Sequence, residues 1–423
     1  MTNLAPFLIF FAGAALASVT KGIYRSVVML AVPLIGAFNL YTMAPDAGLT
    51  VSVFEYTLDL LAIDRLSTLF GYLFHLAAFF AIIYSLHIRD TAQHVSGLLY
   101  AGSALGAVYA GDMISLFLFW EVLAVTSAFL ILARKTDRAR RAAMRYLLIQ
   151  VLSGVILLSG VLIRLHVTGT TAFGAIGLGD LSTLGGLATW LIFLAFGIKC
   201  AFPFLHNWLT DAYPEGTPTG TVFLSAFTTK VAVYALARGY AGTEILVYIG
   251  ATMTMFPIFF AVIENDLRRV LGYSMINQIG FMVCGIGIGT HLAVNGAISH
   301  AFNDVVFKGL LFMSMGAVLY RTGKINGTDL GGLYKSMPKT AAFCLVGAAS
   351  ISAFPLFSGF VSKSMVMVAA LEEGHSIVWL ALLFASAGVF HHAGIKIPFF
   401  AFFAHDSGIR CKEAPTNMLI AMA

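Results

Sequence analysis

The sequence predicts an all-α polytopic membrane protein, from its composition, its long apolar runs and the placement of its basic residues. Hydrophobic residues make up 59% of the 423 residues and charged residues only 11%, whereas soluble domains carry about 25% charged residues. The mean hydropathy is +0.89. Apolar stretches of membrane-spanning length recur along the chain, which indicates helices. The net charge of +5 arises in particular loops and does not indicate nucleic-acid binding.

Thirteen long apolar runs are each predicted to form a membrane helix. Proline and glycine interrupt or follow the runs at 187–205 and 341–370, so we expect broken helices there. A fourteenth run begins at Thr416 and is cut off at Ala423, which predicts about 14 helices with the last one truncated. The first run lacks the charged flank and cleavage site of a signal peptide, so we expect a retained helix. The thirteen runs lie at 4–19, 26–43, 64–86, 96–110, 113–132, 146–165, 187–205, 221–238, 243–263, 268–289, 293–320, 341–370 and 377–403.

The distribution of lysine and arginine predicts the orientation of these helices. If the basic loop 134–145 is cytoplasmic, alternate counting places most basic residues of the loops on the same side. Only Arg65, Arg164 and Arg238 fall on the other side. We therefore expect a multi-pass protein of the bacterial inner membrane with its N-terminus outside.

Ionisable residues inside the apolar runs are the candidate functional residues. A charge at the centre of a membrane helix costs about 2.5–3.5 kcal/mol, so such residues are usually functional. Every basic residue placed deep in a run is lysine, which can release its proton when buried, whereas arginine keeps it. These residues therefore predict a proton path through the membrane. They are Glu121, Lys199, Lys230, Lys308, Lys363 and Lys396.

Two of these lysines lie beside predicted helix breaks. Pro203 follows Lys199 closely, and it removes a backbone donor and should end the helix. In the second half of the chain, Pro355 and Gly359 lie close to Lys363 and precede it. Unwound membrane helices line polar cavities, and matched breaks predict an internal repeat with binding sites near them. The alternative for both lysines is a position near the membrane interface.

His300, Asp304 and Lys308 are spaced i, i+4 and i+8. This spacing places an imidazole, a carboxylate and an amine along one helix face, within reach of one another. Such a ladder can pass protons. The alternative is a self-neutralising polar face that packs against another helix.

Glu121 and Lys230 complete the first half, but spacing alone does not show which lysine Glu121 faces. Lys396 lies near the end of its run, beside His391 and His392. It is either a terminal proton exit or an interfacial lysine. The two histidines do not favour haem or metal binding, because adjacent residues point to different helix faces.

No cofactor is expected. The four cysteines show no CxxC spacing, which argues against zinc, iron–sulfur and covalent haem sites. The sequence has no Walker-type or dinucleotide-binding glycine pattern, so ATP-driven pumping by this chain is not predicted.

At these residues the chain resembles the antiporter-like family shared by Mrp-type Na⁺/H⁺ antiporters and the proton-pumping subunits of respiratory complex I. The resemblance covers about residues 64–403, and its order of motifs is more specific than any one motif. Its marks are Phe119-Trp120-Glu121, the stretch from Lys199 to Pro218 with Pro203, His206, Trp208 and Asp211, then Lys230, Asp266 to Arg269, Tyr273-Ser274, Gly280, His300 to Gly309 and Ser358 to Lys363.

The resemblance implies two inverted five-helix repeats, each with a broken helix. It implies that Glu121 pairs with Lys199, that Lys230 relays, and that Lys308 and Lys363 serve the second half-channel. The implied divisions are helices 1–3 at 1–95, the half-channels at 96–240 and 241–403, and a cytoplasmic loop with the truncated helix at 404–423. Gln278 and a lysine at 363 depart from complex I members and favour the Mrp D-type branch.

We therefore expect an ion-translocating subunit of a multisubunit monovalent cation (Na⁺)/proton antiporter, not itself an enzyme, with other membrane subunits as partners. The alternative is a proton-pumping subunit of a complex I-like NADH dehydrogenase or a membrane-bound hydrogenase. A passive scaffold is disfavoured, because five unused buried lysines would cost about 12–17 kcal/mol before pairing.

Overall fold

The computed structural model describes residues 4–44, 47–53 and 56–423. Within these ranges the chain is mostly helical, and nine helices are long and apolar enough to cross a membrane. The protein is therefore a multi-pass helical membrane protein, as its composition predicts. It divides into two compact units, described separately below: unit 1 comprises Met1–Ile82, Ile88–Cys200 and Ala226–Tyr240, and unit 2 comprises Ile83–His87, Ala201–Ser225 and Ala241–Ala423.

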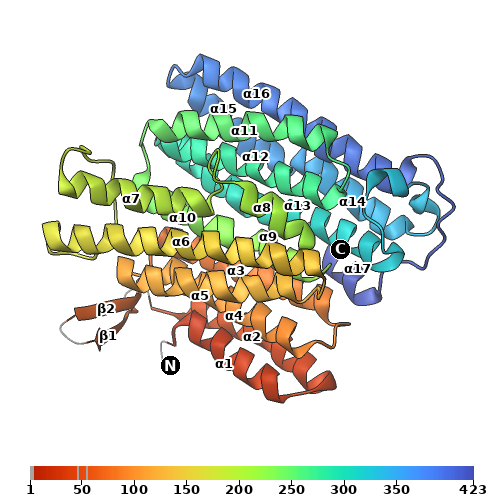
Figure 1. The fold of residues 1–423 in the computed structure, drawn as a ribbon, viewed down its shortest axis with the longest axis horizontal. Helices are drawn as coiled ribbons and strands as arrows, with labels where there is room; N and C mark the ends of the chain where they lie inside the picture. The colour runs from red at the N-terminus through yellow and green to blue at the C-terminus, as the bar shows by residue number, and fades with distance from the viewer. Residues whose placement is uncertain (1–3, 45–46, 54–55) are drawn as a thin grey trace. The chain divides into compact units, whose positions relative to one another are not determined.

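Unit 1 is built from antiparallel helices that pack on their neighbours in the chain. In Figure 1, α5 lies between α4 and α6, α6 packs on α7, and α1 packs on both α2 and α4. The last residues of α3 belong to unit 2. The elements are α1 (Pro6–Val19), α2 (Gly22–Thr42), β1 (Leu49–Val53), β2 (Tyr56–Leu61), α3 (Arg65–Ser85), α4 (Thr91–Tyr109), α5 (Met113–Leu132), α6 (Asp137–Thr168), α7 (Leu184–Lys199) and α10 (Thr228–Tyr240).

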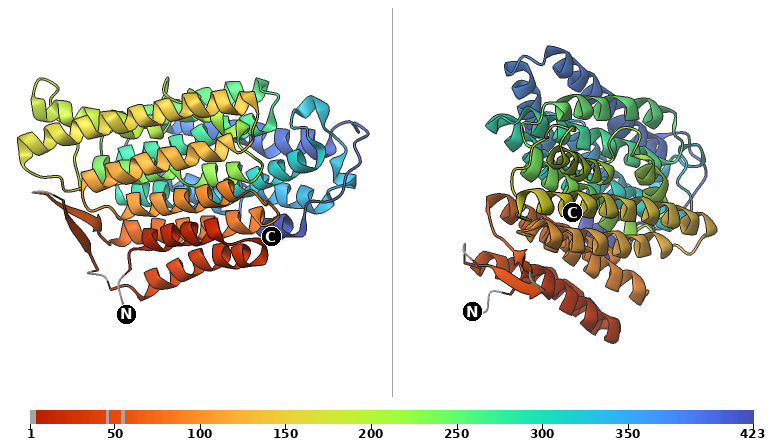
Figure 2. Two further views of the ribbon diagram at one scale, coloured as in Figure 1. Left: turned by 60° about the horizontal axis from the view of Figure 1, so that its bottom comes forward. Right: turned by 60° about the vertical axis from the view of Figure 1, so that its left-hand side comes forward.

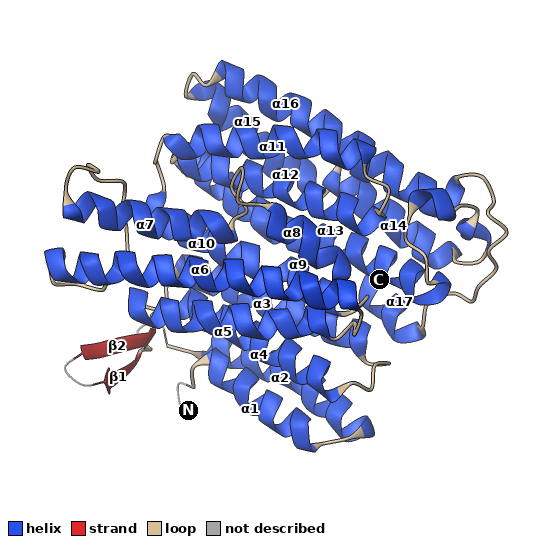
Figure 3. Ribbon diagram, in the orientation of Figure 1, coloured by secondary structure: helices blue, strands red, loops and turns tan. Residues whose placement is uncertain are grey.

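A small β-hairpin corrects the all-α prediction. Strands β1 and β2 pair antiparallel, with Val53 opposite Tyr56 and Val51 opposite Leu58 (Figure 3). The segment between the second and third apolar runs alternates β-branched and polar residues, which is a strand pattern. It was overlooked because it is too short to be a membrane helix. Leu58 and Leu61 are buried and fix one face of the hairpin.

Unit 2 is a second helical bundle. Helix α12 lies beside α11 and α13, α13 also packs against α14 and α15, and α16 packs against α11 (Figure 1; Figure 2 gives two further views). The elements are α8 (Asn207–Ala212), η1 (Tyr213–Glu215), α9 (Gly220–Ala226), α11 (Ile245–Ile263), α12 (Leu267–Ile288), α13 (His291–Thr322), η2 (Gly327–Asp329), η3 (Leu333–Lys335), α14 (Pro338–Ile351), α15 (Ser358–Glu372), α16 (Ser376–Val389), η4 (Phe390–Lys396), η5 (Phe399–Phe403) and α17 (Thr416–Met422).

Side-chain caps fix where several helices begin. Asp112 accepts hydrogen bonds from two backbone N–H groups of α5, and Asp266 does the same for α12. Thr136 accepts from Ala139 N–H at 3.1 Å, so α6 begins at Asp137. Most of the basic segment 134–145 is therefore helical, which corrects its prediction as a loop. Capping satisfies N–H groups that have no partner within the helix.

Both expected helix breaks are present. The first separates α7 from α8, and the second separates α14 from α15. Each turn has the sequence Ala-Phe-Pro followed by an apolar residue, and each has two left-handed residues at the same positions. The φ angles are +61° at Ala201 and +68° at Phe204, and +56° at Ala353 and +77° at Leu356. The two breaks therefore share both sequence and backbone conformation.

Two further interruptions were not predicted. The run at 221–238 divides into α9 and α10 around Phe227. The run at 377–403 begins as α16 and continues in the wider π-helical segments η4 and η5. A π-helical turn is often found at functional sites because it shifts the faces on which side chains project. Lys396 lies at the end of η4.

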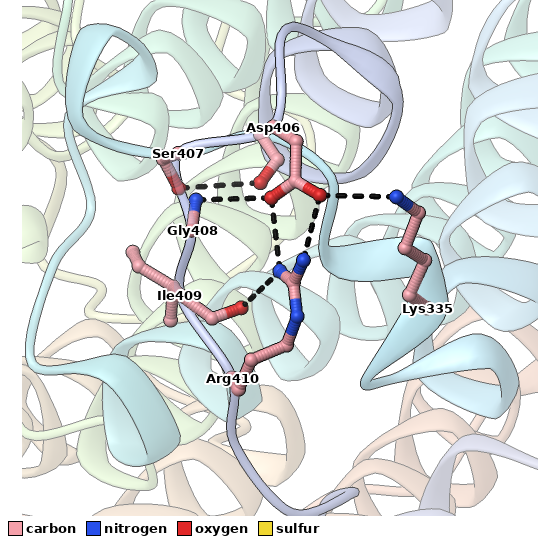
Figure 4. A network of polar contacts seen from close by, with 7 residues as sticks. Lys335, Asp406, Ser407, Gly408, Ile409 and Arg410 are labelled. Atoms are coloured by element: carbon pink, nitrogen blue, oxygen red, sulfur yellow. Dashed lines mark hydrogen bonds and ion pairs between the residues drawn. The ribbon is translucent and has the colours of Figure 1, made fainter.

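The segment after η5 is held by polar contacts at Asp406 (Figure 4). The Asp406 carboxylate accepts hydrogen bonds from Arg410 Nη2 at 2.8 Å, Gly408 N–H at 2.9 Å and Lys335 Nζ at 3.0 Å. These contacts join the loop to η3. The α17 helix then packs against α13 and α14.

Candidate functional site: two clusters of buried lysines

The first cluster, Glu121, Lys199 and Lys230, lies in unit 1. Lys199 and Lys230 are completely buried. Lys199 Nζ donates a hydrogen bond to the Trp120 carbonyl oxygen at 2.6 Å and lies 4.5 Å from the centre of the Trp120 ring. Glu121 acts electrostatically on Lys199. The structure thus places Glu121 within electrostatic reach of Lys199, which sequence spacing did not settle.

Close packing of α5, α6 and α7 fixes the position of the Glu121 carboxylate. A Cβ atom at Gly154 would lie 1.5 Å from Glu121 Oε1, so the carboxylate keeps its position only beside a glycine. Next to it, Trp120 Nε1 donates to Ser153 Oγ at 3.1 Å, and Ser153 Oγ donates to the Ala195 carbonyl oxygen at 2.8 Å. These bonds tie the three helices together around the carboxylate.

Lys230 lies in the first turn of α10, immediately after the break at Phe227. It acts electrostatically on the buried Cys200 thiol, which follows Lys199 directly. Thr228 in the same turn bonds through both its N–H and its hydroxyl to Tyr100 OH. The break therefore positions Lys230 near the end of α7.

The second cluster, His300, Asp304, Lys308 and Lys363, lies in unit 2. The three α13 residues are completely buried. His300 Nδ1 hydrogen-bonds to Ser362 Oγ at 2.9 Å, and Nε2 hydrogen-bonds to Gln278 Oε1 at 3.1 Å. Lys308 Nζ donates to Ser274 Oγ at 2.9 Å. The hydrogen bonds of His300 and Lys308 therefore link α13 to α12 and α15.

Lys363 is buried at the second helix break. Its Nζ donates to the carbonyl oxygen of Ile351, the last residue of α14, at 2.8 Å. Asp304 acts electrostatically on Lys363. A Cβ atom at Gly359 would lie 2.0 Å from the Ser350 carbonyl oxygen, so the glycine permits α15 to begin close to α14. Gly359 thus has a structural role in the break, near Lys363.

The two lysines beside the breaks share one arrangement. Lys199 and Lys363 each direct their amine to a backbone carbonyl of a neighbouring helix, with an acidic residue, Glu121 or Asp304, within electrostatic reach. A lysine amine can donate a hydrogen bond whether it is charged or neutral. Each lysine can therefore exchange a proton while it keeps its position.

The amine of Lys396 reaches the C-terminal end of α11. Its Nζ donates to the carbonyl oxygens of Ala261 at 3.0 Å and Val262 at 2.7 Å, and also to that of Glu264. A lysine in this position caps a helix C-terminus and interacts favourably with the helix dipole. It lines a cavity of about 560 Å³ together with Glu264 and His391. The structure thus gives Lys396 a capping role beside a cavity.

The family that matches this sequence is described as NADH:quinone oxidoreductase/Mrp antiporter, TM, and the match covers residues 110–390. The chain belongs to this family. Both clusters lie within the matched residues, and Lys396 lies just after them. The resemblance predicted from motif order is therefore confirmed.

Similar proteins come from both branches of the family. The chain is 33% identical over 317 residues to the D-type subunit of the Na(+)/H(+) antiporter of Alkalihalophilus pseudofirmus, covering 71% of this chain and 64% of that protein. It is 32% identical over 357 residues to NADH-quinone oxidoreductase subunit N of Desulforudis audaxviator, covering 77% and 69%. The chain spans 64% of the length of the D-type relative and 51% of the A-type subunit of the same antiporter.

Two solved structures share the fold. A chain of the Mrp complex from Dietzia sp. DQ12-45-1b superposes with a TM-score of 0.86 at 25% identity, covering 96% of this chain and 81% of that one. A chain of the archaeal membrane-bound sulfane sulfur reductase superposes with a TM-score of 0.88 at 26% identity, covering 100% and 74%.

The supporting residues expected in this family member occupy the breaks and their surroundings. Pro203 and Pro355 lie in the two matched turns. The His206 ring packs against Phe256 with centroids 4.6 Å apart at the start of α8. Asp211 is half-buried on α8.

The contacts of several polar residues near the unit 2 cluster were not predicted from the sequence. Ser274, Gln278 and Ser362 hydrogen-bond to side chains of the cluster, whereas in the sequence they figured only in the resemblance to the family. His392 is completely buried in η4, and both Lys308 and Lys363 act electrostatically on its ring. His391 is exposed, as expected for adjacent residues on different faces.

The burial of one arginine was not predicted. Arg268, counted with the basic residues of the cytoplasmic side, lies in the first turn of α12 and is only 1% exposed. Its guanidinium donates to the carbonyl oxygens of Pro214 at 3.0 Å, Gly216 at 3.1 Å and Thr217 at 3.2 Å. Because arginine keeps its charge, it suits this fixed structural contact. The titratable lysines remain the candidates for ion movement.

Proposed function

We propose that this chain is an ion-translocating subunit of a multisubunit monovalent cation/proton antiporter, with Na⁺ as the cation. The observation that carries the proposal is the arrangement of Lys199 with Glu121. A buried amine bonded to the Trp120 carbonyl lies within electrostatic reach of the Glu121 carboxylate. The D-type relative, which is named for a Na(+)/H(+) antiporter, supports this assignment.

In the proposed mechanism, Lys199 and Lys363 are proton carriers in their own units. Lys199 releases a proton and becomes a neutral amine. The remaining N–H groups can still donate a hydrogen bond to the Trp120 carbonyl oxygen. Loss of that charge leaves the Glu121 carboxylate without its partner, so a proton or cation is drawn to the carboxylate. Lys230 relays protons in unit 1. His300, Asp304 and Lys308 perform the relay in unit 2, and Lys396 marks the cavity end of that path.

The proposed complete architecture has fourteen membrane helices with two inverted five-helix repeats at 96–240 and 241–403, preceded by helices 1–3 at 1–95 and followed by a cytoplasmic loop at 404–423. The matched Ala-Phe-Pro turns support the repeat, because equal sequence and equal backbone angles recur beside Lys199 and near Lys363. A structure of the assembled complex tests it, since the two halves should superpose with opposite membrane orientation.

The proposed setting is the bacterial inner membrane, with the N-terminus outside and other membrane subunits bound. The Mrp complex with a similar chain supports partner subunits, and the basic residues near the start of α6 support a cytoplasmic position for that end. Single cysteines at exposed Arg138 and Thr170 should react with a membrane-impermeant thiol reagent from opposite sides. Reaction of both from the same side would refute the orientation.

A second candidate is the proton-pumping subunit of a redox-driven complex, either a complex I-like NADH dehydrogenase or a membrane-bound hydrogenase. Two similarities support this candidate. The chain is 32% identical to NADH-quinone oxidoreductase subunit N, and it shares its fold with a chain of the sulfane sulfur reductase. Purification in mild detergent followed by mass spectrometry separates the two. Small hydrophobic subunits alone support the antiporter, whereas bound flavin or iron–sulfur subunits support the redox pump.

The decisive experiment measures sodium-driven proton movement in everted membrane vesicles that contain the complex. We expect Lys199→Ala to abolish the exchange while the complex still assembles, because the buried proton carrier is lost. Lys324→Ala is the matched control, since this lysine is exposed and lies in a loop. Normal exchange by assembled Lys199→Ala would refute the proposal.

A further inference from the structure

One buried face of α6 is polar along successive turns, although the helix lies among apolar neighbours. Tyr146, Gln150, Ser153 and Gly154 are spaced by four, three and one residues, so they share this face. All are buried. Gly154 contacts the Glu121 carboxylate, so the face leads along the helix from Tyr146 to the unit 1 cluster.

Four hydroxyl groups meet at the Tyr146 end of this face. Tyr146 OH and Ser127 Oγ are 2.8 Å apart, and Tyr146 OH and Thr228 Oγ1 are 3.5 Å apart. Thr228 Oγ1 in turn lies 2.6 Å from Tyr100 OH. The hydroxyls come from α5, α6, α10 and α4. Each hydroxyl can both donate and accept a hydrogen bond, so the set can reorient and pass a proton.

Beyond this hydroxyl set, toward the unit 1 cluster, the side chains of Gln150 and Glu121 have buried atoms without a protein hydrogen-bond partner in the described residues. Gln150 is completely buried, and neither its Nε2 nor its Oε1 has a hydrogen-bond partner in the part of the chain that the structure describes. Glu121 Oε1 is also buried and without such a partner there. An unsatisfied buried polar group costs about 1–3 kcal/mol, so internal water usually satisfies it.

Water fits these groups better than a cation does. The Gln150 amide presents both a donor and an acceptor, and water can satisfy both. A cation would satisfy only the amide oxygen and the Glu121 carboxylate, and it would leave the amide N–H groups buried without an acceptor. The site therefore requires a ligand that both donates and accepts hydrogen bonds.

We infer that the α6 face binds internal water between Gln150 and Glu121, and that this water joins the hydroxyl set at Tyr146 to the Glu121–Lys199 pair as a proton path. The path leads toward the basic N-terminal end of α6. The inference rests on the proposed function, because it identifies the route by which protons reach Glu121 in unit 1. Gln150 orients the water, and Tyr146 carries the proton.

The test compares Gln150→Leu, Tyr146→Phe and the control Tyr234→Phe in the assembled complex. Leucine removes the unsatisfied amide without a large change in volume, so the complex should be as stable as wild type or more stable. Sodium-driven proton movement should nevertheless fall by at least about tenfold, the scale of a lost proton-transfer group. Tyr146→Phe should also slow it, and both variants should change its pH profile and solvent isotope effect.

Tyr234→Phe is matched because it also removes one buried hydroxyl, whose hydrogen bond goes to the Val108 carbonyl oxygen outside the hydroxyl set. It should retain wild-type exchange. Wild-type rates, pH profile and isotope effect in assembled Gln150→Leu would overturn the inference. If wild type and Tyr234→Phe show no exchange at all, the proposed function fails instead.

A second measurement does not depend on a variant that folds. A high-resolution map of the wild-type complex should show water within hydrogen-bond distance of the Gln150 amide. A map of that quality without water there, or with apolar atoms packed against the amide, would overturn the inference.

Discussion

Replacing Gly154 with alanine should displace Glu121 without removing its charge. The added Cβ would lie 1.5 Å from Glu121 Oε1, whereas ordinary contacts begin at 3.4 Å. The carboxylate must therefore move by about 2 Å, the difference between these distances. It is the end of a flexible side chain, so it can move more easily than the backbone of α5 or α6.

The displacement should weaken the coupling between Glu121 and Lys199. For two charges at least about 4 Å apart in a medium of effective dielectric constant about 20, an extra separation of about 2 Å removes up to about 1.4 kcal/mol. That free energy corresponds to a change of up to about tenfold in an equilibrium constant. We therefore expect Gly154→Ala to slow sodium-driven proton movement in everted vesicles by up to about tenfold while the complex assembles normally.

Gly309→Ala is the control for this prediction. Gly309 lies in α13, next to Lys308, and an added Cβ would meet no atom within 4 Å. The substitution raises helix propensity by about 1 kcal/mol and should leave transport unchanged. Assembled Gly154→Ala with wild-type transport would show that the position of Glu121 does not set the rate, and the reasoning would be wrong.

Two further predictions concern the second helix break and the loop at Asp406. In Gly359→Ala the new Cβ would clash with the Ser350 carbonyl oxygen, so the substitution should destabilise the purified complex by about 1–3 kcal/mol. The loss should appear as a lower Tm, and an unchanged Tm would contradict the close approach of α15 to α14. Hydrogen bonds from Arg410, from Gly408 N–H and from Lys335 hold the pKa of Asp406 below its usual range, so this contact should stabilise the loop above about pH 4 and weaken as pH falls. Protection of the loop amides, measured as the observed exchange rate relative to the intrinsic rate at the same pH, should therefore decrease on acidification in wild type. Asp406→Asn should show the lower protection already at about pH 7 with little further change, and equal protection in both proteins at every pH would refute the role of the carboxylate.

The sequence predicted those parts of the membrane fold that depend on composition or on a single proline that breaks a helix. Long apolar runs identified the helices, and Pro203 and Pro355 identified both matched breaks, because proline removes a backbone donor. The break at Phe227 was not predicted, since no proline or glycine marks it. The hairpin was missed because its strands are short and lie between longer runs.

The site was predictable for charged residues and not for their partners. Lys199 and Lys363 stand out because a charge in an apolar run is rare. Ser362 and Gln150 do not, because serine in a membrane helix often bonds to the carbonyl four residues earlier, and one glutamine fits an apolar face without a visible pattern. Which groups meet across helices depends on rotation about the helix axis, and residue spacing within one helix does not report it.

The Ala-Phe-Pro turns have a consequence for how such a protein moves. Ala201 and Ala353 hold left-handed backbone angles that glycine would adopt more readily, and a non-glycine residue there costs about 1–2 kcal/mol. A methyl group at such a position, two residues before a rigid pyrrolidine ring, restricts rotation of the backbone. The two turns are therefore stiff corners and poor hinges. Under the proposed function, the two turns would stay fixed while side chains and solvent around them rearrange.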